Sequence, residues 1–277
     1  MKLLKGGELL TSVKEMIRKG LLGMHPLKRP GFAIVINEDD YGSLQYANQL
    51  IKDCNDVGIN VFSVRVNKSA DEMFIYRAID DFNTMEDVTA IMVQHPLPEQ
   101  FREMEKDIIN MIDAKKIVDA PFWRMDLDIQ HTWPGTPYGI YLMLKSHLNG
   151  EFNGKKIVVI GRSKTVGMPL SMILTYYGAT VTTCHSKTGI DNIREYCKNA
   201  DIIISAAGCP NLIDDSFELN EHQTIIDVGC NMLNGKLCGD VSFNQVAEKV
   251  GAITPVPGGV GPMTRLAILT EIIEKSE

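Results

Sequence analysis

The feature that most constrains the fold is an alternation of apolar segments with amphipathic ones, which begins at residue 31. The segments 31–36, 60–66 and 88–97 are rich in β-branched and other apolar residues, as is typical of buried strands. Helical periodicity follows each of them, over 43–57, 69–85 and 98–112. Strands and helices that alternate in this way build a mainly parallel sheet covered by helices. The first half of the chain is therefore predicted to be an α/β lobe.

A second series of the same kind follows the segment PGTP at residues 134–137. It predicts helices over 137–148, 167–177 and 189–198, and strands over 155–161, 179–185, 201–208 and 224–229. A chain of 277 residues is longer than most single domains and short for three, which favours two lobes. The segment ITPVPGGVGPMT at 253–264 interrupts the pattern before a last amphipathic helix, so we expect the chain to cross between the lobes there. We expect a ligand in the cleft between the lobes, near the carboxyl ends of the strands.

Composition and charge exclude several classes of protein. The net charge is −7 and the sequence contains no dense run of Lys and Arg, so we expect no nucleic-acid partner. The six cysteines form no C-x-x-C pair, which argues against a structural zinc site and a disulfide framework, and we expect no metal. No apolar run reaches the length that spans a membrane. These features predict a soluble cytoplasmic protein with free thiols and no membrane partner.

Polar residues at the ends of predicted elements are the candidates for catalysis. The stretch GSLQYANQLIKD reads as the start of a helix with Ser43 as its N-cap, and it presents Tyr46. Gln94 ends a buried strand in IMVQHPLP, and Asp119 ends another short apolar segment in KIVDA. Side chains at strand ends face the opening of the sheet, so these three residues could form a polar cluster on the wall of the cleft. The alternative is that they are simple caps and a packed tyrosine.

The segment KKIVVIGRSKTVGMPL predicts a nucleotide site. Gly161 directly follows an apolar strand, and Gly167 opens a helix whose first N–H groups and positive dipole end favour a pyrophosphate. Ser163 stands where the standard G-x-G-x-x-G pattern has its second glycine, so the alternative is a purely structural turn. The next predicted strand ends in CHSKT, which offers His185 and Ser186 in place of the acidic residue that selects NAD. With Arg162 nearby, the pattern favours NADP, with NAD as the alternative.

These motifs, together with SLQYANQLIKDCNDVGI, ADIIISAAGCP, IIDVGCN, GDVSF and above all TPVPGGVGPMT, resemble those of the methylenetetrahydrofolate dehydrogenase/cyclohydrolase (FolD) family over nearly the whole chain. The resemblance implies two α/β lobes, the second a Rossmann-type dinucleotide-binding domain, with the C-terminal helix returning to the first lobe. It implies a folate-binding catalytic domain over 1–136 and 258–277, and an NAD(P)-binding domain over 137–257. It also implies a homodimer.

The family oxidises 5,10-methylenetetrahydrofolate with NAD(P) and then hydrates the methenyl cation to 10-formyltetrahydrofolate. The resemblance implies that Tyr46, Gln94 and Asp119 are catalytic and also bind the tetrahydrofolate substrate, together with Pro257, Gly258 and Gly259. The implied cofactor-binding residues are Gly161, Arg162, Ser163, Val166, Gly167, His185, Ser186, Thr188 and Gly229.

One departure from the family pattern bears directly on activity. The family has a lysine four residues after the helical tyrosine, and this chain has Leu50 there. Lys52 lies about 240° around the helix from Tyr46 and cannot easily replace it. Further departures are His95, Ala120, Gly135 and Arg265.

Because hydration needs a proton carrier and leucine has no titratable group, we expect a dehydrogenase whose cyclohydrolase activity is weak or absent. The alternatives are a bifunctional enzyme in which His95 or Arg265 restores a basic group, and a non-catalytic folate- or nucleotide-binding paralogue.

Overall fold

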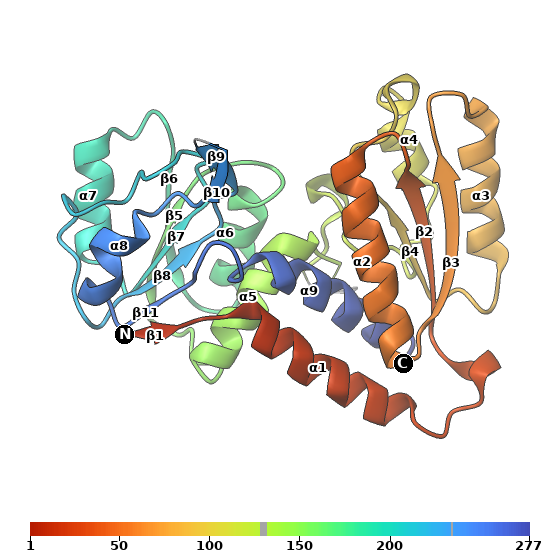
Figure 1. The fold of residues 1–277 in the computed structure, drawn as a ribbon, viewed down its shortest axis with the longest axis horizontal. Helices are drawn as coiled ribbons and strands as arrows, with labels where there is room; N and C mark the ends of the chain where they lie inside the picture. The colour runs from red at the N-terminus through yellow and green to blue at the C-terminus, as the bar shows by residue number, and fades with distance from the viewer. Residues whose placement is uncertain (128–131, 234) are drawn as a thin grey trace. The chain divides into compact units, whose positions relative to one another are not determined.

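The computed structural model describes residues 1–127, 132–233 and 235–277 (Figure 1). The chain divides into two compact units. We call residues 11–132 with 268–277 the N-terminal unit, and residues 1–10 with 133–267 the C-terminal unit. These units differ from the domains expected from the sequence at 1–10, 133–136 and 258–267. As functional domains, the expected boundaries stay a prediction.

The N-terminal unit is built on a parallel sheet of three strands in the order β3-β2-β4. The strands are β2 (Gly31–Asn37), β3 (Asn60–Val66) and β4 (Ala90–Val93), and the helices around them are α2 (Tyr41–Val57), α3 (Glu72–Thr84) and α4 (Glu105–Asn110). Every residue of β2 is buried, as expected of a central strand covered on both faces. The α/β character predicted for this half of the chain is confirmed.

Helix α2 begins earlier than the sequence predicted, and the prediction of Ser43 as its N-cap was wrong. Asp40 is the N-cap, and its Oδ1 accepts the N–H of Ser43 at 2.7 Å. The carboxylate satisfies one of the N–H groups that a helix leaves free in its first turn, so the helix starts at Tyr41. The helix ends at Gly58, whose φ of 95° is the left-handed conformation of a helix C-cap.

The region after β4 is also less regular than predicted. In place of one helix over 98–112, the structure has a 3₁₀ turn (Glu99–Phe101) followed by the short helix α4. The predicted strand over 88–97 is limited to Ala90–Val93, because the segment turns away at Pro96 and Pro98.

The C-terminal unit contains a parallel sheet of six strands in the order β1-β11-β8-β7-β5-β6. Its strands are β1 (Lys2–Leu3), β5 (Lys156–Ile160), β6 (Thr180–Cys184), β7 (Ile202–Ser205), β8 (Thr224–Asp227) and β11 (Ala252–Ile253). Its helices are α5 (Gly135–His147), α6 (Gly167–Tyr176), α7 (Ile190–Lys198) and α8 (Phe243–Val246), and a hairpin joins β9 (Asn231–Leu233) to β10 (Lys236–Cys238). The strand order reverses at β5, so the sheet is doubly wound, and the Rossmann-like α/β unit predicted for this half of the chain is confirmed.

Two helices contribute residues to both units. Helix α1 spans Gly6–Leu21 and helix α9 spans Gly261–Glu274, and the boundaries between the units fall after Leu10 and after Ala267. Residues 268–277 thus belong to the N-terminal unit, which confirms the predicted return of the last helix to the first lobe. None of the helices in the described ranges is long and apolar enough to cross a membrane.

The six cysteines are free thiols that differ sharply in exposure. Cys54, Cys184 and Cys197 are buried, whereas Cys209 and Cys230 are exposed and Cys238 is intermediate. Burial raises the pKa of both Cys54 and Cys197 to about 12, so these two thiols stay protonated at neutral pH.

Candidate active site

The turn from β5 into α6 has the shape that a dinucleotide needs. Gly161 has a φ of 131°, and a Cβ there would lie 2.2 Å from the carbonyl oxygen of Ala206. A Cβ on Gly167 would lie 2.1 Å from the carbonyl oxygen of Gly161. Only glycine fits at either position, and the resulting close approach of backbone to the start of a helix is the arrangement that accepts a pyrophosphate. This cradle fits the NAD(P) predicted from the sequence.

Ser163 has a local structural role at this turn. Its hydroxyl oxygen accepts the N–H groups of Val166 at 3.1 Å and of Gly167 at 3.4 Å. The side chain therefore holds the loop in the conformation that leads into α6, where the standard pattern would have a glycine. Direct contact of Ser163 and Val166 with a cofactor stays a prediction.

The segment after β6 forms a small turn beside this cradle. The N–H of Gly161 donates to the carbonyl of Cys184 at 2.9 Å, which brings the ends of β5 and β6 together. Within the turn, the N–H of His185 donates to Oγ1 of Thr188 at 2.9 Å, and the N–H of Lys187 donates to Nδ1 of His185 at 3.2 Å. Thr188 thus shapes the turn, and His185 is fixed by it.

We call Arg162 and Lys164 of the loop after β5, with Lys187 of the turn after β6, the basic rim. Arg162, Ser186 and Lys187, which the sequence pointed to, are all exposed. Lys164 is a further exposed cation on the same loop, and sequence reasoning missed it because the dinucleotide pattern assigns that position no role. Such a rim favours the 2′-phosphate of NADP over the free hydroxyl of NAD.

A cavity of about 240 Å³ lies in the same unit. It is lined by residues at the end of β8 and by the loop that leads into the first turn of α9. Gly229 lines it, together with Pro257, Gly258 and Gly259. The structure therefore brings Gly229, which is predicted to bind the cofactor, together with Pro257, Gly258 and Gly259, which are predicted to bind substrate. Asp227, the last residue of β8, also lines the cavity. It was not predicted, because the backbone groups that it binds, at Asp240 and Val241, are distant in the sequence.

In the N-terminal unit, Gln94 is held in a defined orientation. Its side chain is 4% exposed, its N–H donates to the carbonyl of Val35 at 3.0 Å, and its Nε2 donates to the carbonyl of Ser43 at 2.9 Å. Its buried Oε1 has no hydrogen-bond partner among the described residues. Because an unsatisfied buried acceptor is costly, this oxygen is a candidate to accept a hydrogen bond from a ligand.

Tyr46 and Asp119 each lie on an element that contacts the segment of Gln94. Tyr46 follows Ser43 by three residues on α2, which places the two on neighbouring positions of one helix face. Asp119 directly follows a segment that pairs in parallel with β4 through Ile91 and Ile117. Its φ is 51°, and its N–H donates to Oε2 of Glu271 at 2.9 Å. Gln94 and Asp119 therefore both lie where parallel segments of one sheet end.

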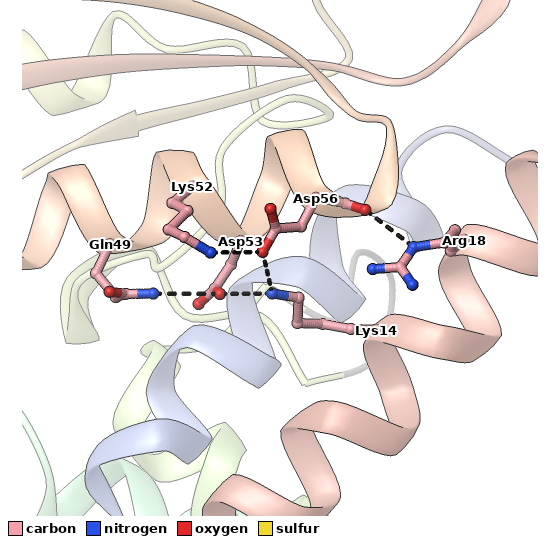
Figure 2. Close-up of polar contacts among 6 residues, drawn as sticks. All are labelled: Lys14, Arg18, Gln49, Lys52, Asp53 and Asp56. Carbon is pink, nitrogen blue, oxygen red and sulfur yellow. Dashed lines mark hydrogen bonds and ion pairs between the residues drawn. The ribbon is translucent and has the colours of Figure 1, made fainter.

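Leu50 is fully buried in the N-terminal unit, with an exposed fraction of 0%. Lys52 is 65% exposed at its side chain, and its ammonium lies 3.0 Å from Oδ2 of Asp56. It belongs to a charged cluster, drawn in Figure 2, in which Lys14 of α1 lies 2.8 Å from both Asp53 and Asp56. Sequence reasoning missed this cluster, because nothing in a single sequence pairs residue 14 with residue 53.

The other departures from the family pattern have different surroundings. His95 is 38% exposed at its side chain, and its Nδ1 lies 3.3 Å from Oε2 of Glu105. Ala120 is fully buried in the core of the N-terminal unit, where its methyl group packs against apolar side chains. Gly135 is buried at the start of α5.

The parallel sheet with its glycine cradle and basic rim defines a dinucleotide-binding α/β protein with a second α/β unit, in which Ser43 fixes the side chain of Gln94. Family models identify it further. The tetrahydrofolate dehydrogenase/cyclohydrolase catalytic domain matches residues 4–119, and the NAD(P)-binding domain of the same family matches residues 134–277. The chain belongs to the tetrahydrofolate dehydrogenase/cyclohydrolase family, as its sequence motifs predicted, and NAD(P) is its cofactor class.

Individual relatives agree with this assignment. The bifunctional protein FolD of Hydrogenobaculum sp. (strain Y04AAS1) is 38% identical, over 99% of this chain and 98% of the relative. The crystal structure of the bifunctional enzyme FolD from Campylobacter jejuni is 32% identical with a TM-score of 0.87, and the match covers 100% of this chain and 98% of that one. The FolD structure from Trypanosoma brucei, a complex with NADP cofactor and inhibitor, is 27% identical with a TM-score of 0.85, over 99% and 96% of the two chains.

Proposed function

We propose that this protein is an NADP-dependent 5,10-methylenetetrahydrofolate dehydrogenase whose cyclohydrolase activity is weak or absent. The observation that carries the proposal is Leu50. It occupies the position at which the family pattern has a lysine, and its side chain is fully buried. The two activities place different demands on that position, and only one of them needs an ionisable group there.

Oxidation depends on binding and orientation. When bound, NADP accepts the hydride from the methylene bridge of the folate. The task of the chain is then to hold the folate, and Gln94 suits it because its amide is fixed by Ser43 and its Oε1 is available as an acceptor. The carboxylate of Asp119 is proposed to accept hydrogen bonds from the aminopyrimidine edge of the pterin. Tyr46 is proposed to complete this wall. Leucine at position 50 is compatible with all of these roles.

Hydration requires that a water molecule lose a proton and that the tetrahedral adduct collapse with protons correctly delivered. The side chain of Leu50 can neither accept nor donate a proton. Lys52 cannot replace the missing group from its own position, since its ammonium is exposed and paired with Asp56. The dehydrogenase step is therefore retained in our proposal and the cyclohydrolase step is not.

The preference for NADP over NAD is part of the proposal. Arg162 and Ser186 are proposed to hold the 2′-phosphate, with Lys164 and Lys187 contributing positive charge at the same rim. The FolD structure from Trypanosoma brucei that carries NADP supports this choice by relationship.

A bifunctional enzyme is the second candidate, and one observation favours it. His95 directly follows Gln94, is partly exposed, and its Nδ1 lies 3.3 Å from Oε2 of Glu105, so an imidazole lies next to the proposed folate wall. The curated relative from Hydrogenobaculum is named bifunctional, which supports the same reading.

A paired assay on the purified protein tests these possibilities. Oxidation of methylenetetrahydrofolate is followed through reduced cofactor, and hydrolysis of 5,10-methenyltetrahydrofolate through loss of its own absorbance. We expect clear oxidation with NADP and hydrolysis close to the uncatalysed rate. Strong hydrolysis would establish the bifunctional candidate, and a lack of oxidation would point to a non-catalytic paralogue.

Two further expectations are kept as proposals. The homodimer rests on the family resemblance, and the molar mass in solution by light scattering tests it.

A cytoplasmic location is supported by the six free thiols, which suit a reducing compartment.

A further inference from the structure

Asp240 is a fully buried carboxylate that collects hydrogen bonds from several loops. Its Oδ2 accepts from Oγ of Ser205 at 3.1 Å, from the N–H of Ala207 at 2.8 Å and from the N–H of Gly208 at 3.1 Å. Its Oδ1 accepts from the N–H of Cys209 and from Nδ2 of Asn231, both at 2.9 Å. Its exposed fraction is 0%, so these contacts replace water entirely.

The donors come from the carboxyl ends of two adjacent strands. Residues 207–209 follow β7, and Asn231 begins β9 shortly after β8. Three successive backbone N–H groups that converge on one anion form the kind of nest that proteins use to bind phosphate. Here the anion is the side chain of Asp240, which holds together the loops that follow β7 and β8.

A second buried carboxylate continues the same network. Oδ1 of Asp227 accepts the N–H groups of Gly229 and Asp240, both at 2.9 Å, and its Oδ2 accepts the N–H of Val241 at 3.0 Å. The loop is packed tightly against these groups, because a Cβ on Gly229 would lie 2.4 Å from Oδ1 of Asp240. The position of Gly229 is therefore fixed by both carboxylates.

This network borders the cavity that Gly229 lines. Asp227, Gly229 and Cys230 line that cavity together with Pro257 and Gly258. Asp240 is not among its lining residues and lies behind the loops that are. Any effect of Asp240 on a bound dinucleotide must therefore act through the shape of those loops.

We propose that Asp240 is a positioning residue for the dinucleotide: its carboxylate holds the loops after β7 and β8 in the conformation that receives the cofactor. The proposal rests on the proposed function for the identity of the cofactor. It differs from a general role in stability, because it predicts an effect on cofactor affinity that the folate side does not share.

The decisive variant is Asp240→Asn, which keeps the size of the side chain but places an N–H₂ group against N–H donors. We expect the dissociation constant for NADPH, measured by fluorescence titration well below the thermal midpoint, to rise about tenfold to a hundredfold, as for one lost charge-assisted contact. The KM for NADP should rise with it, while the KM for methylenetetrahydrofolate stays within about twofold.

The matched control is Asp53→Asn, which alters a buried carboxylate of the N-terminal unit. It should lower stability without changing NADPH affinity. A second variant, Asn231→Ala, removes a single partly buried donor to Asp240, and it should weaken NADPH binding about threefold or more even if Asp240→Asn does not fold.

Unchanged NADPH affinity in a folded Asp240→Asn protein or, where that variant does not fold, in Asn231→Ala overturns the proposal, as does an equal rise in the KM for folate. The titration needs no turnover. If the unmodified protein binds NADPH but does not oxidise the folate, the proposed function fails while the role of Asp240 is still measured.

Discussion

At the scale of single residues, the consequence of Leu50 can be tested by restoring a lysine. We expect Leu50→Lys to increase hydrolysis of 5,10-methenyltetrahydrofolate at least tenfold over the unmodified protein, because general acid–base assistance is worth about 10²- to 10⁴-fold. The gain should be partial, since the position is fully buried and burial disfavours the charged ammonium. The measurement is the loss of methenyl absorbance at fixed enzyme concentration.

Leu50→Met is the matched control for this variant, because methionine nearly conserves volume and cannot titrate. It should leave both activities unchanged, whereas Leu50→Lys should also lower the denaturation midpoint. A folded Leu50→Lys protein without added hydrolysis would contradict our account of the missing activity.

Arg162 provides the residue-scale test of cofactor preference. We expect Arg162→Ala to raise the KM for NADP about tenfold or more while changing the KM for NAD less than about twofold, because a charge-assisted contact to phosphate is worth about 1.5–3 kcal/mol. Lys156→Ala, at the exposed start of β5 and thus at the opposite end of that strand, is the control. Equal effects of Arg162→Ala on both cofactors would remove Arg162 from the phosphate site.

The residues that sequence reasoning located share one property: their role follows from their place in a local pattern. Gly161 and Gly167 were predicted from a strand-to-helix turn, and the structure leaves no room for a Cβ at either. Gln94 was predicted from the end of a buried strand. Asp227, Asp240 and Glu271 were missed, because each carboxylate acts on partners that are distant in the sequence.

At the scale of elements, Lys14 makes the ion pairs that join α1 to α2. Lys14 bridges Asp53 and Asp56, and Arg18 of the same helix donates to the carbonyl of Asp56 at 3.0 Å (Figure 2). Burial lowers the pKa of Lys14, but its hydrogen bonds to both aspartates outweigh this and raise it overall. The bridge therefore stays charged throughout the neutral range.

We expect Lys14→Ala to lower the free energy of unfolding by about 1–3 kcal/mol, because it takes a charged partner away from the buried carboxylate of Asp53. Lys52→Ala should cost less than about 0.5 kcal/mol, since that ion pair lies at the surface. Urea denaturation of the two variants measures both values, and equal losses would show that burial of Asp53 does not matter.

The elements themselves were predictable in proportion to their length and regularity. The strand over 60–66 was predicted with its observed bounds, and β2 and β5 were displaced by only a residue or two. Strands β1 and β11 were missed, because two residues give no periodicity and each strand is defined by its pairing in the sheet. The start of α2 was misplaced because Asp40 and Ser43 are both good caps, and only the fold selects between them.

At the scale of the whole molecule, stability should depend on pH through Asp227. Burial raises the pKa of its carboxyl to about 6, against backbone hydrogen bonds that lower it, and the nearby Asp240 raises it further. A raised pKa means that the folded state disfavours the ionised form. The stabilisation is present below the unfolded pKa of 3.8 and is lost as the pH rises through about 6.

Between pH 5 and pH 7.5, the unmodified protein should therefore lose about 1 kcal/mol more unfolding free energy than Asp227→Asn, which cannot titrate. Urea denaturation at the two pH values measures the difference. Parallel pH dependence in the two proteins would mean that Asp227 is already ionised at pH 5.

The difference in exposure among the six thiols has a practical consequence for labelling this protein. Cys54 and Cys197 are buried and unreactive in the folded chain, whereas Cys230 is exposed and lines the same cavity as Gly229. A maleimide dye added to the native protein would attach to the C-terminal unit, at Cys209 and Cys230. Through Cys230, the chain thus carries its own attachment point for a fluorescent reporter beside the proposed cofactor-binding residue Gly229, with no engineered cysteine.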